Sequence, residues 1–364
     1  MFKKAIGMLL MFSYFSIIGA NPLKSDEDVW FFPTSANFSA GENTEENSWN
    51  IPIHHWVFEK EEKSLTRKIT QKLLSEVIES IEVTEEEADS PIFHQRLIWF
   101  LVDNERGKQI EICFNKPFVT NSTKNGTKKK PIKLAITNPN GHATTHVKFE
   151  GAAKAGDWVT YSVIDPTKPH RKFTGKAQLI PEEGLSVISD VDDTIKISEV
   201  LDKKVLIKNT FVKPYKTTEG FPEYYKALAK QGAYFHYVSA SPWQLQPSLK
   251  PFMDAHYPKG TIALRNFRLK DSSLLDFLKS SAEYKIDQIK SIIERYPKHH
   301  FILIGDSGEH DPDVYAKIYQ LFPKNIKAIQ IRAVKGSDLT DQRFEKVFSA
   351  VPKTLWQVFD KPSF

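Results

Sequence analysis

The stretch from Leu185 to Thr194 reads LSVISDVDDT, an apolar run that ends abruptly in acidic residues and a threonine. The run is short enough for a buried β-strand. The acids Asp190, Asp192 and Asp193 repel one another and gain nothing from burial. The pattern therefore favours a divalent cation or phosphate chemistry at the carboxyl end of the strand. The alternative is a helix N-terminus, where Asp and Thr side chains cap free backbone amides.

Strands and helices alternate after residue 185. Helices are expected at 222–232, 286–295 and 313–322, and strands at 233–238, 262–267, 301–305 and 326–334, the last of the series. This alternation predicts an α/β fold with a parallel sheet and helices on both faces. Ligands bind to such sheets outside the carboxyl ends of the strands.

The part before residue 183 has a different pattern. Strands are expected at 30–33 and 53–58, and apolar residues recur every four positions from Leu65 to Ile81, which predicts an amphipathic helix. Short alternating runs follow at 94–102, 109–114, 132–137, 144–149, 158–164 and 172–179. They predict an antiparallel, sandwich-like β domain. The expected division is a signal peptide at 1–20, N-terminal strands and a helix at 21–90, the β-rich domain at 91–182, and the α/β domain at 183–364.

Composition limits the classes of function. The chain has 364 residues, 40% of them hydrophobic, and a formal net charge of +5 whose basic residues are interspersed, so no nucleic-acid-binding stripe is expected. Lys3 and Lys4 precede an apolar stretch and the small pair Gly19-Ala20, which predicts an exported protein. A retained membrane anchor is the alternative, although the stretch is short for a spanning helix. The single cysteine, Cys113, excludes an internal disulfide.

Polar residues end three of the expected strands. They are Asp190, Asp192 and Thr194 after the first, Ser239-Ala240-Ser241 after the second, and the run from Gly305 to Asp311 after the third. A parallel sheet brings these ends to one edge. Carboxylates from Asp190, Asp192 and Asp306 would hold a hard cation, and the lack of a Cys or His cluster favours Mg²⁺ over zinc.

These residues suggest a phosphoryl-transfer mechanism. A carboxylate beside Mg²⁺ can attack phosphorus and form an acyl phosphate that water then cleaves. Asp190 is the expected nucleophile, and Asp192 the acid that protonates the leaving oxygen and later deprotonates the water. Ser239 can donate to a phosphoryl oxygen, and Lys285, just before the helix at 286–295, can neutralise charge. The simpler alternatives are a turn serine and an exposed lysine.

Four motifs resemble those of the haloacid dehalogenase (HAD) superfamily of phosphatases: Asp-x-Asp-x-Thr at 190–194, Ser239, Lys285, and Gly-Asp-x-x-x-x-Asp at 305–311. The longer strings at 189–196, 236–245, 264–269 and 303–312 resemble the catalytic domain of actin-patch-type phosphatidate phosphatases and their bacterial relatives. Asn266 stands where an acid is common in that family, and the exported N-terminus is a second departure.

The resemblance implies a Rossmann-like (HAD-like) phosphatase domain at 183–364. It implies Mg²⁺-dependent hydrolysis of phosphatidate to diacylglycerol and phosphate through an aspartyl phosphate. It also implies a catalytic role for Thr194 and a substrate-binding role for Ser241, with Asp311 supporting the metal ligands.

Substrate selection is less constrained. A lipid phosphate needs a cationic clamp and an apolar surface, and the candidates are Lys196, Lys213, Arg265 and Arg268 for the first and Phe211, Tyr215, Phe221 and Trp243 for the second. Core packing explains the same aromatic residues. The expected partner is phosphatidate or another phosphomonoester, with a peripheral membrane surface allowed and no nucleic acid. A phosphatase for soluble esters or phosphoproteins, and a lipid- or host-binding module with a vestigial phosphatase domain, are the alternatives.

Overall fold

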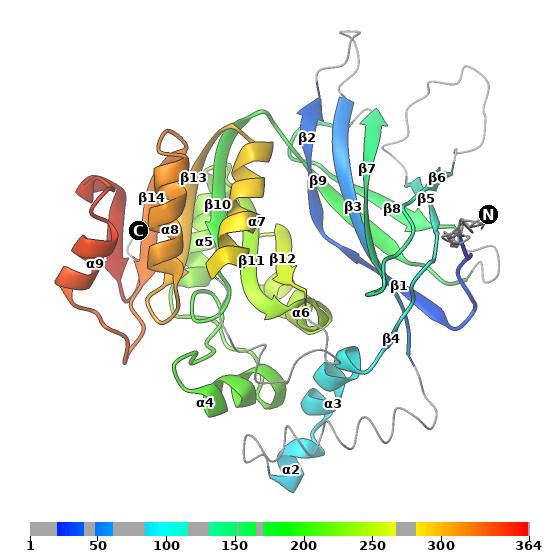
Figure 1. Cartoon of the computed structure of the whole chain (residues 1–364), viewed down its shortest axis with the longest axis horizontal. Coiled ribbons are helices and arrows are strands. Elements are labelled where there is room, and N and C mark those ends of the chain that lie inside the picture. Colours follow the sequence, from blue (N-terminus) through cyan, green and yellow to red (C-terminus); the bar gives the residue numbers. More distant parts are fainter. Residues whose placement is uncertain are drawn as a thin grey trace, which may run out of the picture.

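The computed structural model describes residues 20–39, 48–60, 84–115, 131–150, 153–164, 170–266 and 282–362. Within these ranges a β-rich part and an α/β part lie side by side (Figure 1). The expected signal segment up to residue 19, the helix expected from Leu65 to Ile81, and Arg268 lie outside the described residues.

The α/β part is built on a six-stranded sheet in which all neighbours are parallel. Its strands, in spatial order, are β12 (Thr261–Arg265), β11 (Tyr234–Pro242), β10 (Glu183–Ser189), β13 (Lys298–Asp306), β14 (Ile326–Arg332) and β15 (Trp356–Phe359). The order reverses at β10, which pairs with β11 on one side and β13 on the other. The parallel α/β sheet predicted from the alternation is confirmed, and β15 is an additional strand beyond the one expected to be last.

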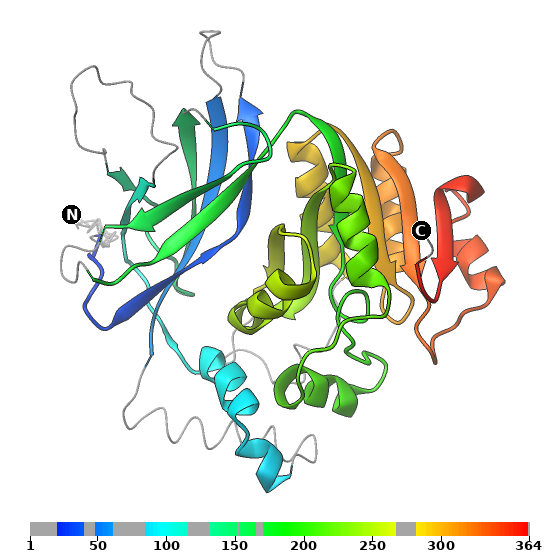
Figure 2. The same ribbon diagram turned by 180° about the vertical axis from the view of Figure 1, so that it is seen from behind.

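Helices cover both faces of this sheet. They are α5 (Phe221–Lys230), α6 (Gln246–His256), α7 (Ala282–Arg295), α8 (Asp311–Leu321) and α9 (Asp341–Val347), whereas α4 (Lys203–Ile207) lies beyond the ends of the strands (Figure 1). Neighbouring residues of β10 point to opposite faces, since Val187 belongs to the core cluster with α5 and α6, and Ile188 to the cluster with α7 and α8. Figures 1 and 2 show these two helical layers from opposite sides.

The β-rich part is a nine-stranded mixed sheet. Its strands are β1 (Glu27–Phe32), β2 (Thr34–Ser39), β3 (Ser48–Glu59), β4 (Asp103–Asn104), β5 (Glu111–Phe114), β6 (Ile132–Lys133), β7 (His142–Glu150), β8 (Trp158–Val163) and β9 (Thr174–Ile180). The expectation of a purely antiparallel domain is wrong, because β2 and β9 pair in parallel. Strands on both sides of residue 90 share this sheet, so the boundary expected there does not separate two sheets.

A short helical segment between β3 and β4 packs against the α/β part. The strand expected at 94–102 is instead helix α3 (Pro91–Leu97) followed by a 3-10 turn at Ile98–Phe100. Ser90 explains the difference, because its side chain accepts a hydrogen bond from the backbone of Phe93 and caps a helix that begins with Pro91. Before it lies the short helix α2 (Glu85–Ala88). Phe93 and Leu97 pack in the same core cluster as Phe211 of the α/β part.

Within the described ranges, no helix is both long enough and apolar enough to cross a membrane.

His55 makes stability depend on pH. Its side chain on β3 is fully buried, and neither ring nitrogen has a hydrogen-bond partner among the described residues. Burial lowers the pKa of His55 to about 3, so the folded protein holds the neutral ring. The unfolded chain keeps a histidine pKa of about 6.5. Because the folded pKa is the lower one, this contribution to stability is lost as the pH falls below the unfolded value toward the folded one.

We expect His55→Leu to raise the free energy of unfolding by about 1 kcal/mol at pH 7, because it removes unsatisfied buried polar atoms. The gain should be larger at pH 5, where wild type is already losing stability. Urea unfolding at both pH values measures this. His146→Leu, on the exposed face of β7, is the matched control and should behave alike at both. An equal gain from His55→Leu at both pH values would contradict the account.

Candidate active site

The polar residues expected at the strand ends meet at one edge of the parallel sheet. Ser189, the last residue of β10, is in register with Tyr237 of β11 and Ile304 of β13. The next residue, Asp190, donates its backbone N–H to the carbonyl of Ile304, 2.9 Å away. Asp306 is the last residue of β13. The predicted convergence of these strand ends is confirmed.

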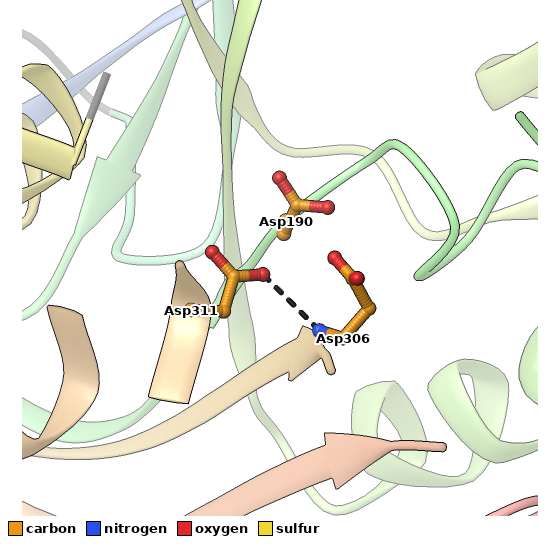
Figure 3. A group of neighbouring side chains, drawn as sticks. All are labelled: Asp190, Asp306 and Asp311. Atoms are coloured by element: carbon orange, nitrogen blue, oxygen red, sulfur yellow. Dashed lines mark hydrogen bonds between the residues drawn. The ribbon is translucent and has the colours of Figure 1, made fainter. Parts of the chain in front are cut away.

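Three buried carboxylates form the centre of the site (Figure 3). Oxygen atoms of Asp190, Asp306 and Asp311 all lie within 4.8 Å of one another. Asp311, at the start of α8, accepts the backbone N–H of Asp306 at 3.1 Å. Asp306 Oδ1 accepts the backbone N–H groups of Gly308 and Glu309, whereas its Oδ2 has no partner within the described residues. The site thus keeps carboxylate oxygen free for a ligand.

Gly305 permits this packing. A Cβ atom at this position would collide with the Oδ2 and Cβ atoms of Asp311. Any larger residue would displace the Asp311 carboxylate from the backbone N–H of Asp306. The glycine is therefore required by the close approach of the Asp311 side chain to the strand backbone.

Lys285 is the cation of this group. It lies in the first turn of α7, whereas the sequence placed it just before the helix, and its side chain is only 2% exposed. Its Nζ lies 2.8 Å from Asp190 Oδ1, 2.6 Å from Asp311 Oδ1 and 3.1 Å from Glu309 Oε2. Burial acts to lower the pKa of Lys285, but the Asp190 and Asp311 carboxylates outweigh it and hold the pKa well above the usual value. Lys285 is therefore a buried ammonium and not an exposed lysine.

One ammonium does not balance the surrounding carboxylates. Burial raises the pKa of Asp190 well above its usual range, and Asp311 and Glu309 add to the rise against the opposing effect of Lys285. Burial likewise raises the pKa of Asp306, with Asp311 and Asp190 as further causes. A further cation that approaches such a cluster stabilises the ionised form of its carboxylates. The group has the electrostatic character of a divalent-cation site.

Asp192 belongs to a second, adjacent network. Its Oδ1 contacts Lys196 Nζ at 2.8 Å and accepts the Ser198 hydroxyl at 2.8 Å. Its Oδ2 accepts the hydroxyls of Ser239 at 3.0 Å and Ser241 at 2.9 Å. Burial alone would raise the pKa of Asp192, but Lys196 and the hydroxyl donors outweigh it and hold the pKa below its usual value.

The carboxylates expected to hold the metal, those of Asp190, Asp192 and Asp306, therefore do not form one group. The structure groups Asp190 and Asp306 with Asp311, and the carboxylate of Asp192 is outside this group because both of its oxygens are held by Lys196 and the serines. Asp311 was expected to support the metal ligands, and its contacts with Lys285 and the Asp306 backbone suit that supporting role.

A tight loop after β10 carries Lys196 and Ser198. Asp193 adopts a left-handed conformation with φ of 53°, and its carboxylate accepts the backbone N–H groups of residues 198, 199 and 200. No role was expected from the sequence for Asp193, Ser198 or Glu309. The motif strings contain Asp193 and Glu309, but their contacts depend on loop geometry that spacing does not reveal. Thr194 Oγ1 is fully buried and has no partner among the described residues.

The residues expected to select substrate differ in how deeply they are buried. Phe211 and Phe221 are 1% and 0% exposed within a core cluster, so the alternative of core packing is correct for both. Trp243 is also buried, against aromatic residues of the β-rich part. Arg265 is half-buried at the end of β12, and Lys213 is exposed.

The part of the chain that holds these residues resembles a known family. Residues 185–333 match the family described as the catalytic domain of phosphatidate phosphatase APP1. The resemblance to the catalytic domain of actin-patch-type phosphatidate phosphatases is thereby confirmed over these residues.

Two curated relatives cover this region. Phosphatidate phosphatase APP1 of Saccharomyces cerevisiae is 38% identical over 168 residues, which are 45% of this chain and 28% of the yeast protein. An uncharacterized protein of Schizosaccharomyces pombe is 31% identical over 169 residues, which are 45% of this chain and 27% of that protein. The chain thus spans less than a third of the length of these relatives.

Among solved structures, the chain has some likeness to a bacterial 2,6-sialyltransferase. That likeness covers 68% of this chain and 44% of the sialyltransferase, at 10% identity and a TM-score of 0.23. A score this low carries no argument about fold or function.

We expect Lys285→Met to lower the free energy of unfolding by about 3–5 kcal/mol at pH 7, because it leaves buried carboxylates uncompensated. The pKa values of Asp190 and Asp306 are raised in the fold, so their stabilising contribution is present at low pH and is lost as the pH rises through the folded values. The variant should therefore be closer to wild type at pH 5 than at pH 7. Urea unfolding at the two pH values measures this.

Lys290→Met provides the control, because Lys290 is exposed on the same helix. It should change stability by no more than about 0.5 kcal/mol at either pH. A Lys285→Met variant as stable as this control would show that the carboxylates do not depend on the ammonium.

Proposed function

We propose that this chain is a Mg²⁺-dependent phosphatidate phosphatase, which hydrolyses phosphatidate to diacylglycerol and phosphate through a phosphorylated Asp190. The observation that carries the proposal is the buried group of Asp190, Asp306 and Asp311 around Lys285. It lies in the segment that matches the catalytic domain of phosphatidate phosphatase APP1. We also propose that residues 183–364 form a Rossmann-like domain of the haloacid dehalogenase type, which the reversal of strand order at β10 supports.

The donor set fits a magnesium ion. Asp190 Oδ2 and Asp306 Oδ2 are buried oxygen atoms without a hydrogen-bond partner in the described part of the chain. Mg²⁺ prefers such hard oxygen ligands, one or two carboxylates together with waters and substrate phosphate. Asp190 and Asp306 would hold the ion, which supplies Lewis-acid polarisation of the phosphoryl group when bound.

Side chains of this protein carry out the attack on phosphorus, the proton transfers and the stabilisation of charge. In the first step Asp190 attacks phosphorus, the bond from phosphorus to the alcohol oxygen breaks, and Asp192 gives the leaving oxygen its proton. In the second step water attacks the phosphorus of phosphorylated Asp190, Asp192 takes a proton from that water, and Asp190 is released with inorganic phosphate. Lys285 stabilises charge on the nucleophile and the phosphoryl oxygens throughout.

Asp192 has to carry a proton before the first step. Lys196, Ser239 and Ser241 now hold it as a carboxylate, and all three are donors suited to phosphoryl oxygens. When these donors turn to the phosphate, Asp192 loses the contacts that favour its ionised form and can take up the proton. Substrate binding and protonation of the acid are then one coupled event.

The wider context is part of the proposal. Residues 1–20 favour an exported protein. The proposed place of action is a membrane surface that contains phosphatidate. Arg265 is among the cations proposed to bind the phosphate. A phosphatase for soluble phosphomonoesters is the second candidate, and burial of Phe211 and Phe221 in the core favours it, since neither provides a surface for acyl chains. The retained buried carboxylates argue against a vestigial domain.

We expect Asp190→Asn to reduce Mg²⁺-dependent phosphate release by a factor of at least about 10³, because it removes the nucleophile. The change keeps the side-chain shape, so the thermal midpoint should stay within a few degrees of wild type. Asp313→Asn, an exposed acid on α8, is the control and should retain full activity. Phosphate release by Asp190→Asn near the wild-type rate in a clean preparation would exclude this mechanism.

The two candidate substrates are separated by comparing phosphate release from phosphatidate vesicles with release from soluble esters such as glycerol 3-phosphate and nucleoside monophosphates. We expect activity on the vesicles in the presence of Mg²⁺ and none after chelation, because the carboxylates need the cation to admit an anionic substrate. Faster hydrolysis of the soluble esters would favour the second candidate. Full activity with chelator would exclude the magnesium proposal.

A further inference from the structure

We infer that Arg96, on helix α3 outside the matched catalytic domain, is a positioning residue for Asp192. The inference rests on the proposed function, in which Asp192 is the acid and base. Arg96 lies far from Asp192 in sequence, and its contacts reach Asp192 through two separate routes.

Arg96 is anchored in the α/β part. Its side chain is buried, and its guanidinium donates to the carbonyl of Thr210 at 2.7 Å and that of Lys213 at 2.9 Å. The guanidinium carbon lies 3.6 Å from the centre of the Tyr215 ring. The guanidinium is planar, so it can stack on the ring while it donates the two hydrogen bonds. Lysine has no planar group and cannot stack in this way. Arg96 therefore fixes both the ring and the backbone that leads to it.

The first route runs through the ring. Lys196 Nζ lies 5.3 Å from the centre of the same Tyr215 ring, and the side chain of Lys196 is only 3% exposed. That Nζ contacts Asp192 Oδ1 at 2.8 Å. The Tyr215 ring is thus shared by Arg96 and Lys196, and movement of the ring would move the ammonium that holds Asp192.

The second route runs through the backbone. Thr210 belongs to a single π-helical turn, Lys208–Val212, of the kind often found at functional sites. Asn209 in this turn donates to the carbonyl of Ser198 at 3.1 Å, and the Ser198 hydroxyl donates to Asp192 Oδ1 at 2.8 Å. By binding the Thr210 carbonyl, Arg96 holds the turn that holds Ser198.

Both routes end on the same oxygen atom, Asp192 Oδ1. The other oxygen is held by serines of β11 within the α/β part itself. The N-terminal segment therefore supplies the support for one side of the acid. Its loss should lower the rate of the chemical step more than it lowers substrate binding.

The test compares two contacts that bridge the same two parts of the chain. Arg96→Met removes the inferred support, and Arg96→Lys keeps a cationic donor near the two carbonyls but lacks the planar group that stacks on Tyr215. The matched control is Gln246→Met, which breaks the hydrogen bond of 2.5 Å from Trp30 Nε1 to Gln246 Oε1. Within the described residues the Asp192 carboxylate is held by Lys196, Ser198, Ser239 and Ser241, and not by Gln246. Each full-length variant is assayed for kcat and KM on the better substrate of the panel, for its thermal midpoint, and for hydrogen exchange of the peptide 192–200.

We expect Arg96→Met to lower kcat at least about tenfold and by a larger factor than it raises KM, and Arg96→Lys to recover part of the loss. Exchange in 192–200 should rise in Arg96→Met and stay at the wild-type level in Gln246→Met, even where both lower the thermal midpoint. Unchanged exchange in Arg96→Met, or equal losses of kcat in Arg96→Met and Gln246→Met, would overturn the inference. The exchange measurement needs no turnover, so it decides the positioning role even if wild type proves inactive on every ester and the proposed function fails.

Discussion

The structure of the site depends on one buried ion-pair group, the ammonium of Lys285 among the carboxylates of Asp190, Asp311 and Glu309. Separating buried charges from water is costly, and the cost is recovered only where the geometry is tight. Here α7 provides the lysine, β10 and β13 lead to the acids, and α8 begins with Asp311. The lysine and the carboxylates therefore meet only when these helices pack correctly on the sheet. The chemistry of the site in this way depends on the core of the α/β part.

The site is divided by charge into two halves. Asp190 and Asp306 have raised pKa values because burial and neighbouring carboxylates oppose their ionisation, whereas Asp192 has a lowered pKa because Lys196 and hydroxyl donors outweigh burial. Acids only two residues apart in sequence therefore have opposite properties. Such a separation is what a nucleophile beside a cation and a nearby proton carrier require.

The sequence was informative where regular structure determines position. Polar residues follow the strands expected here, and parallel pairing brings the carboxyl ends of strands to one edge, so the meeting of Asp190 with Asp306 followed from the alternation of strands and helices. It was misleading where a local cap competes with an alternating pattern, since Ser90 and Pro91 start a helix in a run interpreted as a strand. The contacts of Asp192, and the exclusion of its carboxylate from the Asp190 group, depend on a loop with a left-handed residue that no periodicity predicts.

The parallel pairing of β2 with β9 also affects how the chain assembles during translation. β9 is the final strand of the β-rich part, yet it pairs with one of the earliest, so this sheet stays open until residue 180 has left the ribosome. Only Pro181 and Glu182 separate β9 from β10. A nascent chain that stalls before β9 would expose an unpaired strand edge. In a chain that passes β9, the β-rich sheet can close before β10 pairs with its neighbours.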